Sequence, residues 1–365
     1  MGSDLRPALR GQPLRDEGDG GGGVAGGIRP LDRREGAGRG AVSRATHPGA
    51  PRGLGLYASA VVAATLFLVF VGALVTTRDA GLAVPDWPLS FGSINPDGWW
   101  REELVRLEHS HRLVGATIGV LTTLLAVWVW RVNRGSRLRW LGPAAFVAVS
   151  VQGTLGGLRV TEISTTLAIV HGCFGQAFVC LLAAIAVVHT RAWREGSRIA
   201  DPGRLRGLRV AAVGFFAVAY GQLVIGAVMR HHKAGLAIPD FPLAYGRLIP
   251  PLESFAIAIH FAHRVGAVVV LVAAIFLAAR ALRGFRANRP LVAGVVVLLV
   301  LLALQIALGA LVIWLRRATI PTCLHVVNGA LVLASGIFVA LHAFAIRAQG
   351  PLLASAEGGP EGRSA

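Results

Sequence analysis

Four histidines occupy matching places in the two halves of the chain. His111 and His263 are 152 residues apart, and His171 and His325 are 154 residues apart. All four lie at or beside apolar stretches, where an ionisable side chain is costly and usually functional. Neutral imidazole is a good iron ligand, and two imidazoles from different helices suit a planar macrocycle that is held from both faces. The spacing therefore predicts two similar metal or haem sites.

Helix packing and zinc binding are the alternatives to haem for these histidines. A buried, hydrogen-bonded histidine that packs helices would account for one such residue, but it accounts poorly for four matched ones. Zinc fits less well than haem, because no third or fourth Cys, Asp or Glu ligand accompanies either pair.

Glu108 lies one helical turn before His111, on the same helix face. A carboxylate there would lie beside any ligand that His111 binds, and it could act as a base or stabilise positive charge. The matching residue of the second half is His260, so only the first half has the acid. Two sites that only carried electrons would not need an acid in either half. The alternative is that Glu108 is a first-turn residue favoured by the helix dipole. We expect Glu108 to be catalytic.

Arg112 and Arg264 directly follow His111 and His263. They are candidates to pair with carboxylates such as haem propionates. Snorkelling of each arginine to the membrane interface accounts for them equally well.

A long motif is repeated before each of these groups. Residues 72–92 read GALVTTRDAGLAVPDWPLSFG, and residues 226–246 read GAVMRHHKAGLAIPDFPLAYG, at an offset of 154. The prolines fix a turn and prevent a continuing helix. Trp87 and Phe241 could be ordinary interfacial aromatic residues, but repetition of the whole pattern favours a shaped lid over each half. His231 and His232 have no histidine counterparts in the first copy, and we expect them to be solvated.

The elements that carry these residues are predicted to be transmembrane helices. The chain has 365 residues, of which 54% are hydrophobic and only 15% charged, which excludes an ordinary soluble domain. In lipid every backbone polar group needs a partner, and a helix supplies these partners within its own segment. Eight uncharged stretches have about the length of a membrane span: 53–77, 113–130, 140–158, 163–190, 210–229, 265–279, 290–315 and 318–346. The stretch 265–279 is short, and residues 255–264 before it complete the span.

We therefore predict an all-α integral membrane protein with eight transmembrane helices, arranged as two four-helix bundles related by a pseudo-twofold axis. The predicted parts are a disordered tail (1–52), an N-terminal bundle (53–192), a linker (193–208), a C-terminal bundle (209–346) and a second disordered tail (347–365).

The net charge of +17 would suggest nucleic acid in a soluble protein, but its distribution indicates membrane topology and no nucleic acid. Arginines gather at 131–139, 191–209 and 280–289. The positive-inside rule places these segments and both termini in the cytoplasm. Acidic residues among the first 52 argue against a mitochondrial transit peptide, so we expect a bacterial plasma membrane.

Small residues and cysteines also lie within the predicted helices. The stretches 152–157 and 305–310 are rich in Gly and Ala, and we ascribe them to close helix packing. Cys173, Cys180 and Cys323 predict no structural disulfide, since none lies in an outer loop.

Taken together, the Glu108-x-x-His111-Arg112 string, both AGLA-(V/I)-PD-(W/F)-PL loops and the histidines at 171 and 325 resemble haem A synthases over about residues 54–346. The resemblance implies that His263 and His325 are axial ligands of a haem b, with Arg264 beside it. It also implies that His111, His171 and Arg112 hold the substrate haem O or the product haem A, and that Glu108 is the catalytic carboxylate.

The implied reaction converts the C8 methyl of haem O to a formyl group by successive hydroxylations, with water as the oxygen source. The implied partners are a haem O synthase, membrane lipid and an electron acceptor or the quinone pool, and homo-oligomerisation stays open. Many family members carry a cysteine pair in the first outer loop. Here 77–107 and 230–255 contain no cysteine, so we expect no thiol-based step.

Two further functions are compatible with parts of the pattern. A dihaem b-type membrane electron-transfer cytochrome would account for four histidines and the repeat, but neither for the single Glu108 nor for the lids. A transporter with a parallel repeat would need polar residues and broken helices near the bilayer midplane, where this chain has mostly Leu, Val and Ala.

Overall fold

A computed structural model describes residues 52–199 and 201–348 of the protein. They lie in the second of two units, residues 49–365. The tails predicted at 1–52 and 347–365 fall almost wholly outside the described residues.

Within the described residues, eight helices are long and apolar enough to cross a membrane, which confirms the predicted fold class. They are α1 (Arg52–Thr77), α2 (Glu103–Val132), α3 (Leu141–Thr161), α4 (Thr165–Val188), α6 (Pro202–His231), α7 (Phe255–Gly284), α8 (Arg289–Trp314) and α9 (Thr319–Ala345). The shorter elements are a 3-10 turn η1 (Arg137–Trp140), helix α5 (Arg191–Glu195) and strands β1 (Ser197–Ile199) and β2 (Ile346–Ala348). The two strands pair in parallel and were not expected from the sequence.

Three helices extend well beyond the uncharged stretches that predicted them. α2, α6 and α7 each have 30 residues, which corresponds to about 45 Å at 1.5 Å per residue. This length exceeds the roughly 30 Å hydrocarbon core, so charged residues can continue the helices into the interface. The predicted linker 193–208 is accordingly helical from Pro202, and part of each arginine-rich segment belongs to a helix end.

Polar side chains mark where several helices begin. The side chain of Ser164 accepts a hydrogen bond from the amide of Leu167 at the start of α4, and Ser254 accepts one from Ile257 at the start of α7. Asp201 and Asn288 cap α6 and α8 in the same way. Such caps satisfy amide groups that have no partner within the helix.

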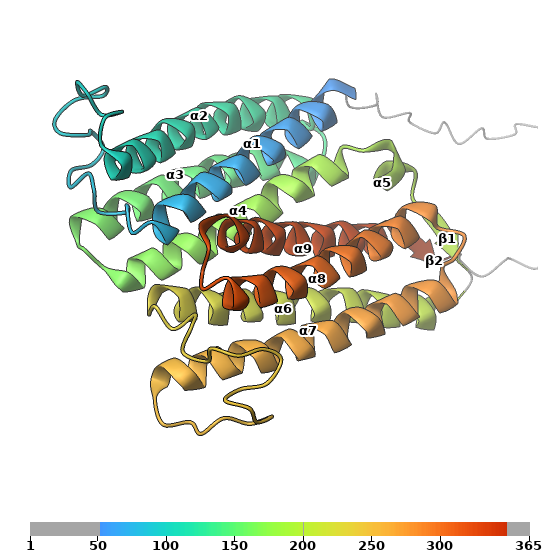
Figure 1. Ribbon diagram of the computed structural model, residues 1–365. Helices are drawn as coiled ribbons and strands as arrows, with labels where there is room; N and C mark the ends of the chain where they lie inside the picture. Colours follow the sequence, from blue (N-terminus) through green and yellow to red (C-terminus); the bar gives the residue numbers. More distant parts are fainter. Residues whose placement is uncertain (1–51, 200, 349–365) are drawn as a thin grey trace, which may run out of the picture. The chain divides into compact units, whose positions relative to one another are not determined.

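Helix contacts follow the two halves of the sequence. α1 and α3 each contact α2 and α4, and α6 and α8 each contact α7 and α9. One buried apolar cluster comes from α1–α4, and the other comes mainly from α6–α9. The halves meet through contacts of α9 with α4 and α1 and of α4 with α6 (Figure 1). The arrangement as two four-helix bundles related by a pseudo-twofold axis stays a prediction.

The repeated loops have the same backbone. Asp79 and Lys233 have φ angles of 54° and 55°, and Phe91 and Tyr245 have φ angles of 51° and 54°. Each loop also has a cis peptide bond before its second motif proline and a short antiparallel bridge at its end. The connection between α1 and α2 and the connection between α6 and α7, which contain these loops, lie at the same end of the helices (Figure 1).

Candidate functional site

Each loop is closed on itself by an aspartate. The carboxylate of Asp86 accepts hydrogen bonds from the amides of Phe91 at 2.7 Å and Gly92 at 2.8 Å. Asp240 accepts from Tyr245 and Gly246 at the same two distances. The hydrogen bonds from the amides of the two glycines and their neighbours lower the pKa of both aspartates. The repeated Pro-Asp pair therefore holds an ionised carboxylate inside each loop.

An arginine of the following helix fastens each loop. Arg112 of α2 donates to the backbone oxygens of Asp86 at 2.6 Å, Leu89 at 2.8 Å and Val84 at 2.9 Å. Five N–H groups are available on a guanidinium, and the lid loop takes three of them. Arg112 thus fastens the lid, and the two roles that the sequence left open for it, pairing with a haem carboxylate and snorkelling, stay predictions.

Arg264 of α7 makes the matching contacts in the second half. It donates to the backbone oxygens of Asp240 at 2.6 Å, Leu243 at 2.8 Å and Ile238 at 3.2 Å. Its Nε atom is buried and has no hydrogen-bond partner among the described residues. We call residues 80–92 and 234–246 the lids, because the arginines fix them over the starts of α2 and α7.

Glu108 is the carboxylate of the first half and is almost fully buried, with 3% of its side chain exposed. Its Oε1 lies 3.1 Å from Arg112 Nε, and its Oε2 lies 3.5 Å from Arg159 Nη2 on α3. Oε2 has no hydrogen-bond partner among the residues that the structure describes. A buried charge needs such compensation, so two cations from different helices hold this carboxylate.

Sequence analysis missed Arg159. The available signal was a lone charge near the C-terminal end of the helix, because α3 carries no other charged side chain. Gln152 and Gln305 mark the alignment of α3 with α8 at an offset of 153, which pairs Arg159 with Val312. The second half therefore has neither the carboxylate nor its second cation.

Arg159 also contacts the first lid. Its Nη2 donates to the backbone oxygen of Gly81 at 3.3 Å. A Cβ atom on Gly81 would lie 2.9 Å from both terminal guanidinium nitrogens, whereas the space around Gly235 is open to 4 Å. In the first half, Gly81 therefore leaves room for Arg159, which connects the lid with Glu108. The matching glycine of the second half, Gly235, has no such contact among the described residues.

The four predicted histidines lie at matched depths. His111 and His263 are the ninth residues of α2 and α7, and His171 and His325 are the seventh residues of α4 and α9. Each imidazole packs against a glycine of a neighbouring helix. A Cβ on these glycines would lie close to the ring Cε1: 3.0 Å for Gly72 and His111, 3.0 Å for Gly156 and His171, 2.8 Å for Gly226 and His263, and 3.3 Å for Gly309 and His325.

These contacts account for two sequence features. The glycine that opens each copy of the repeated motif, Gly72 or Gly226, leaves room for an imidazole. The Gly-rich stretch 152–157 does more than the helix packing expected of it, because Gly156 faces His171 and Gly157 faces the Trp87 indole. In the second half Phe241, with a smaller ring, stands in place of Trp87. Ala310, which has a methyl group, stands in place of Gly157.

The second half arranges its histidines with glutamine side chains. Gln222 Nε2 lies 3.0 Å from His263 Nδ1 and donates to the His263 carbonyl at 2.6 Å. Gln305 Nε2 lies 3.2 Å from His325 Nε2 and donates to the His325 carbonyl at 3.0 Å. Asn328 donates to Gln305 Oε1 at 2.7 Å. Gln222 therefore contacts His263, and Gln305, which Asn328 holds, contacts His325.

The first half lacks most of these amides. Gln152 donates to the carbonyl of His171 at 3.2 Å, but Leu68 and Phe174 stand at the positions that match Gln222 and Asn328. The Nδ1 atoms of His111 and His171 are buried without a hydrogen-bond partner among the described residues.

These donors fit a haem in each half. The ring centres of His263 and His325 are 6.4 Å apart. A metal bound by two imidazole nitrogens at about 2 Å each would separate the ring centres by about 6 Å. The buried Nδ1 atoms of His111, His171 and His325, which have no hydrogen-bond partner among the described residues, and the glycine beside each ring agree with the same use.

Two further histidines lie near the predicted sites, and one of them differs from the expectation. His231 ends α6 and is half-buried, with its ring 3.9 Å from the position of a Cβ on Gly172 of α4, so the prediction that it is solvated was wrong. His260, at the position of Glu108, is buried and accepts a hydrogen bond from the amide of Ile238 at 3.1 Å. An imidazole that fastens the lid thus replaces the carboxylate.

Comparison with known proteins identifies the family of the chain. Residues 55–337 match the COX15-CtaA family, described as cytochrome oxidase assembly protein. The Heme A synthase of Symbiobacterium thermophilum is 35% identical over 261 residues, which cover 68% of this chain and 82% of that protein. That of Geobacillus kaustophilus is 30% identical over 72% of this chain and 83% of its own. That of Halalkalibacterium halodurans is 28% identical over 75% and 91%. The chain therefore belongs to the COX15-CtaA family of cytochrome oxidase assembly proteins.

Proposed function

We propose that this protein is a haem A synthase, which oxidises the C8 methyl of haem O to the formyl group of haem A for terminal oxidases. The observation that carries the proposal is the buried Glu108, three residues before His111 and between Arg112 and Arg159. The similarity to Heme A synthases supports it. Conversion of a methyl to a formyl group with one water oxygen releases four electrons and four protons.

The substrate site belongs to the first half. His111 and His171 bind the iron of haem O, and their partnerless nitrogens suit a ligand that enters and leaves. Glu108 stabilises the electron-poor carbon that forms during oxidation and takes up a proton at Oε2, the oxygen without a hydrogen bond. Arg112 and Arg159 hold this carboxylate in place.

The cofactor site belongs to the second half. His263 and His325 hold a haem b, which supplies one-electron redox chemistry when bound. Gln222 and Gln305 position the two ligands by donating to the backbone carbonyls of His263 and His325. Arg264 Nε, buried and without a hydrogen-bond partner in the described segments, is the donor that we assign to a carboxylate of this haem. Arg112 has one N–H left for the same purpose on the substrate.

The surroundings of the reaction follow from topology. The protein is a multi-pass membrane protein with eight apolar helices. We place it in a bacterial plasma membrane with both termini in the cytoplasm and the lids outside, which the arginine-rich helix ends support. Haem O reaches it from a haem O synthase in the same lipid, and electrons leave to a membrane acceptor or the quinone pool.

A dihaem electron-transfer cytochrome is the second candidate, favoured by the four matched histidines. To separate the two, the protein is expressed beside a haem O synthase, purified in detergent, and its extracted haems are identified by chromatography and mass. We expect haem b together with haem A or its hydroxylated precursor. Haem b alone, with haem O present in the same membranes, would establish the cytochrome instead.

A further inference from the structure

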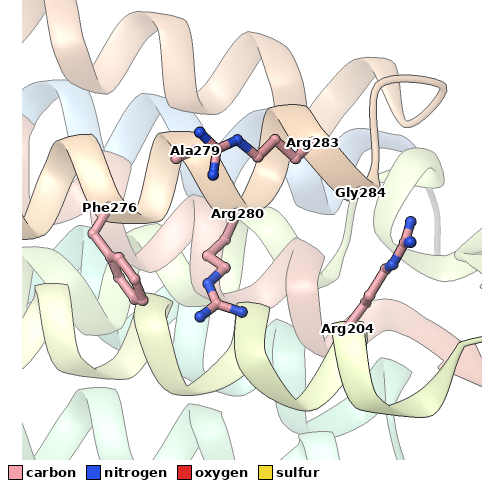
Figure 2. A pocket seen from close by; sticks show the side chains of 6 residues that line it. All are labelled: Arg204, Phe276, Ala279, Arg280, Arg283 and Gly284. Atoms are coloured by element: carbon pink, nitrogen blue, oxygen red, sulfur yellow. The ribbon is translucent and has the colours of Figure 1, made fainter.

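A cavity lies between α6 and α7, far from the lids. Its volume is about 500 Å³, and three arginines line it together with Phe276, Ala279 and Gly284. Figure 2 shows Arg204 extending from α6 towards α7 and Arg280 extending from α7 towards α6, with Arg283 one turn further along α7. It lies where α6 begins and α7 ends.

Among the residues that the structure describes, acidic side chains do not balance the charge of this cavity. Arg204 pairs with the exposed carboxylate of Asp201 at 3.0 Å. In residues 52–199 and 201–348, neither Arg280 nor Arg283 forms a salt bridge within 4.0 Å. The Arg280 guanidinium instead lies 4.9 Å from the ring centre of Phe276. Two positive charges therefore face the cavity without a counter-ion.

The first half fills the equivalent space. Gly53 and Gly207 match at an offset of 154, and Trp128 and Arg280 match at an offset of 152. The Trp128 ring approaches the position of a Cβ on Gly53 to 3.4 Å, and Arg280 Nη1 approaches that on Gly207 to 3.1 Å. An indole has thus been exchanged for a guanidinium at one place in the repeat, which turns a packed contact into a basic cavity.

The apolar surface beside the cavity faces outwards. Along α7, towards the middle of the membrane, Val272, Ile275 and Phe276 are 61%, 55% and 50% exposed. The ends of α6 and α7 reach past the hydrocarbon core, since each helix has 30 residues. The arginines therefore lie at the depth of lipid headgroups, with an acyl-chain surface directly next to them.

We propose that this cavity binds the headgroup phosphate of an anionic phospholipid, with its acyl chains along the exposed face of α7. Guanidinium groups recognise phosphate through paired hydrogen bonds, and basic pockets between transmembrane helices on the cytoplasmic side bind anionic headgroups. A free phosphate shares the headgroup chemistry but leaves the apolar face unused. The proposal is independent of the reaction at the haem sites.

The test compares lipid retention by matched variants. Protein in mixed micelles with equal phosphatidylglycerol and phosphatidylcholine is examined by native mass spectrometry, with phosphatidylglycerol as the probe. Arg280→Trp restores the residue of the first half and fills the cavity, and Arg283→Gln removes one charge. Arg131→Gln removes the arginine that matches Arg283 in the first half and serves as the control. Size-exclusion profiles and thermal unfolding verify that each variant is folded, and Arg280→Gln replaces Arg280→Trp if the indole does not fit.

We expect each substitution in the cavity to weaken phosphatidylglycerol retention about fivefold, the ratio that corresponds to about 1 kcal/mol per arginine. The control should retain it as the unaltered protein does. Equal retention by all variants would overturn the proposal. Displacement of the lipid by millimolar inorganic phosphate alone would show that the cavity is a site for a free anion and would overturn the choice of lipid.

Discussion

Glu108 and His260 occupy the same place in the two halves, yet their contacts differ. Glu108 lies between two guanidinium groups, one from its own helix and one from α3. His260 meets the backbone of a lid, and the residue that matches Arg159 is Val312. In both lids an aspartate accepts hydrogen bonds from two loop amides, and an arginine donates to three loop carbonyls. The duplicated scaffold thus supplies the enclosure twice, and the ionic group is built into one copy only.

Within the described segments, the histidines differ in their side-chain partners, which are present in the second half and not in the first. In the second half both rings approach a glutamine amide, and one of these amides is itself held by Asn328. In the first half the rings have no such side-chain partner among the hydrogen bonds of the described residues. Fixed ligands suit a resident cofactor, and ligands without partners suit a haem that is exchanged. We therefore propose that the second half retains its haem and that the first half exchanges its haem.

The largest effect should come from removing the carboxylate. Glu108→Gln keeps the shape of the site but not its charge, and we expect formyl production to fall by about 10²- to 10⁴-fold, the usual contribution of a proton-transferring group. Bound haem b should be unchanged. Extracted haems are quantified by chromatography, with His260→Gln as the matched control. Normal haem A formation by Glu108→Gln would refute the catalytic assignment.

A smaller loss of haem A formation is expected when Arg159 is replaced by valine, the residue at the matching position of the second half. Arg159→Val removes one of two cations from Glu108 and should lower haem A formation by about 10- to 100-fold, as the loss of a residue that orients a site does. Arg159→Lys should recover part of it. In infrared difference spectra the carboxylate bands of isotope-labelled Glu108 should shift in Arg159→Val. Unshifted bands would show that Arg159 does not position Glu108.

The lid glycines should separate the halves more finely. Gly81→Ala places a methyl 2.9 Å from the Arg159 guanidinium, whereas Gly235→Ala meets open space. The guanidinium end of an arginine can move, so we expect Gly81→Ala to lower haem A formation by only about 10-fold or less. Gly235→Ala should not change it. Equal effects of the two substitutions, measured as rates with purified protein, would contradict the contact between lid and carboxylate.

The smallest effect, and one in which the halves should agree, concerns pH. The amides of Gly92 and Phe91 lower the pKa of Asp86, and those of Gly246 and Tyr245 lower that of Asp240. A depressed pKa contributes stability that is present above the ordinary value of about 4 and is lost as the pH falls through the value in the folded protein.

Both lids should therefore keep their amide protection from pH 7 down to about pH 4 and lose it below. Hydrogen exchange of the two loops measures this, and Asp86→Asn or Asp240→Asn should remove the acid transition from one lid alone. A transition near neutral pH would exclude the aspartates as its cause.

Much of the architecture could be read from hydropathy and repetition. Residues 163–190 and 318–346 predicted α4 and α9 closely, because charged residues border these stretches. The starts of α2 and α6 were missed, since helical turns in the interface can carry Glu103 or Arg204 without a hydropathy signal. The strands β1 and β2 were also missed, because three residues carry no usable pattern.

The candidate site divides in the same way. Matched offsets identified the four histidines and Glu108, because the repeat exposes any residue that differs between its copies. Arg159 was missed, since α3 lies outside the conspicuous motif and only the fold brings it to Glu108. The contacts of Arg112 and Arg264 with lid carbonyls depend on loop conformation, which a sequence pattern does not contain.

The most direct test of the difference between the halves compares His111→Ala with His263→Ala. Each variant is purified from membranes that contain haem O, and its extracted haems are identified by chromatography and mass. The account predicts that His111→Ala retains haem b but contains neither haem O nor haem A, and that His263→Ala loses haem b while still inserting as a folded protein. Loss of the same haem from both variants would contradict it.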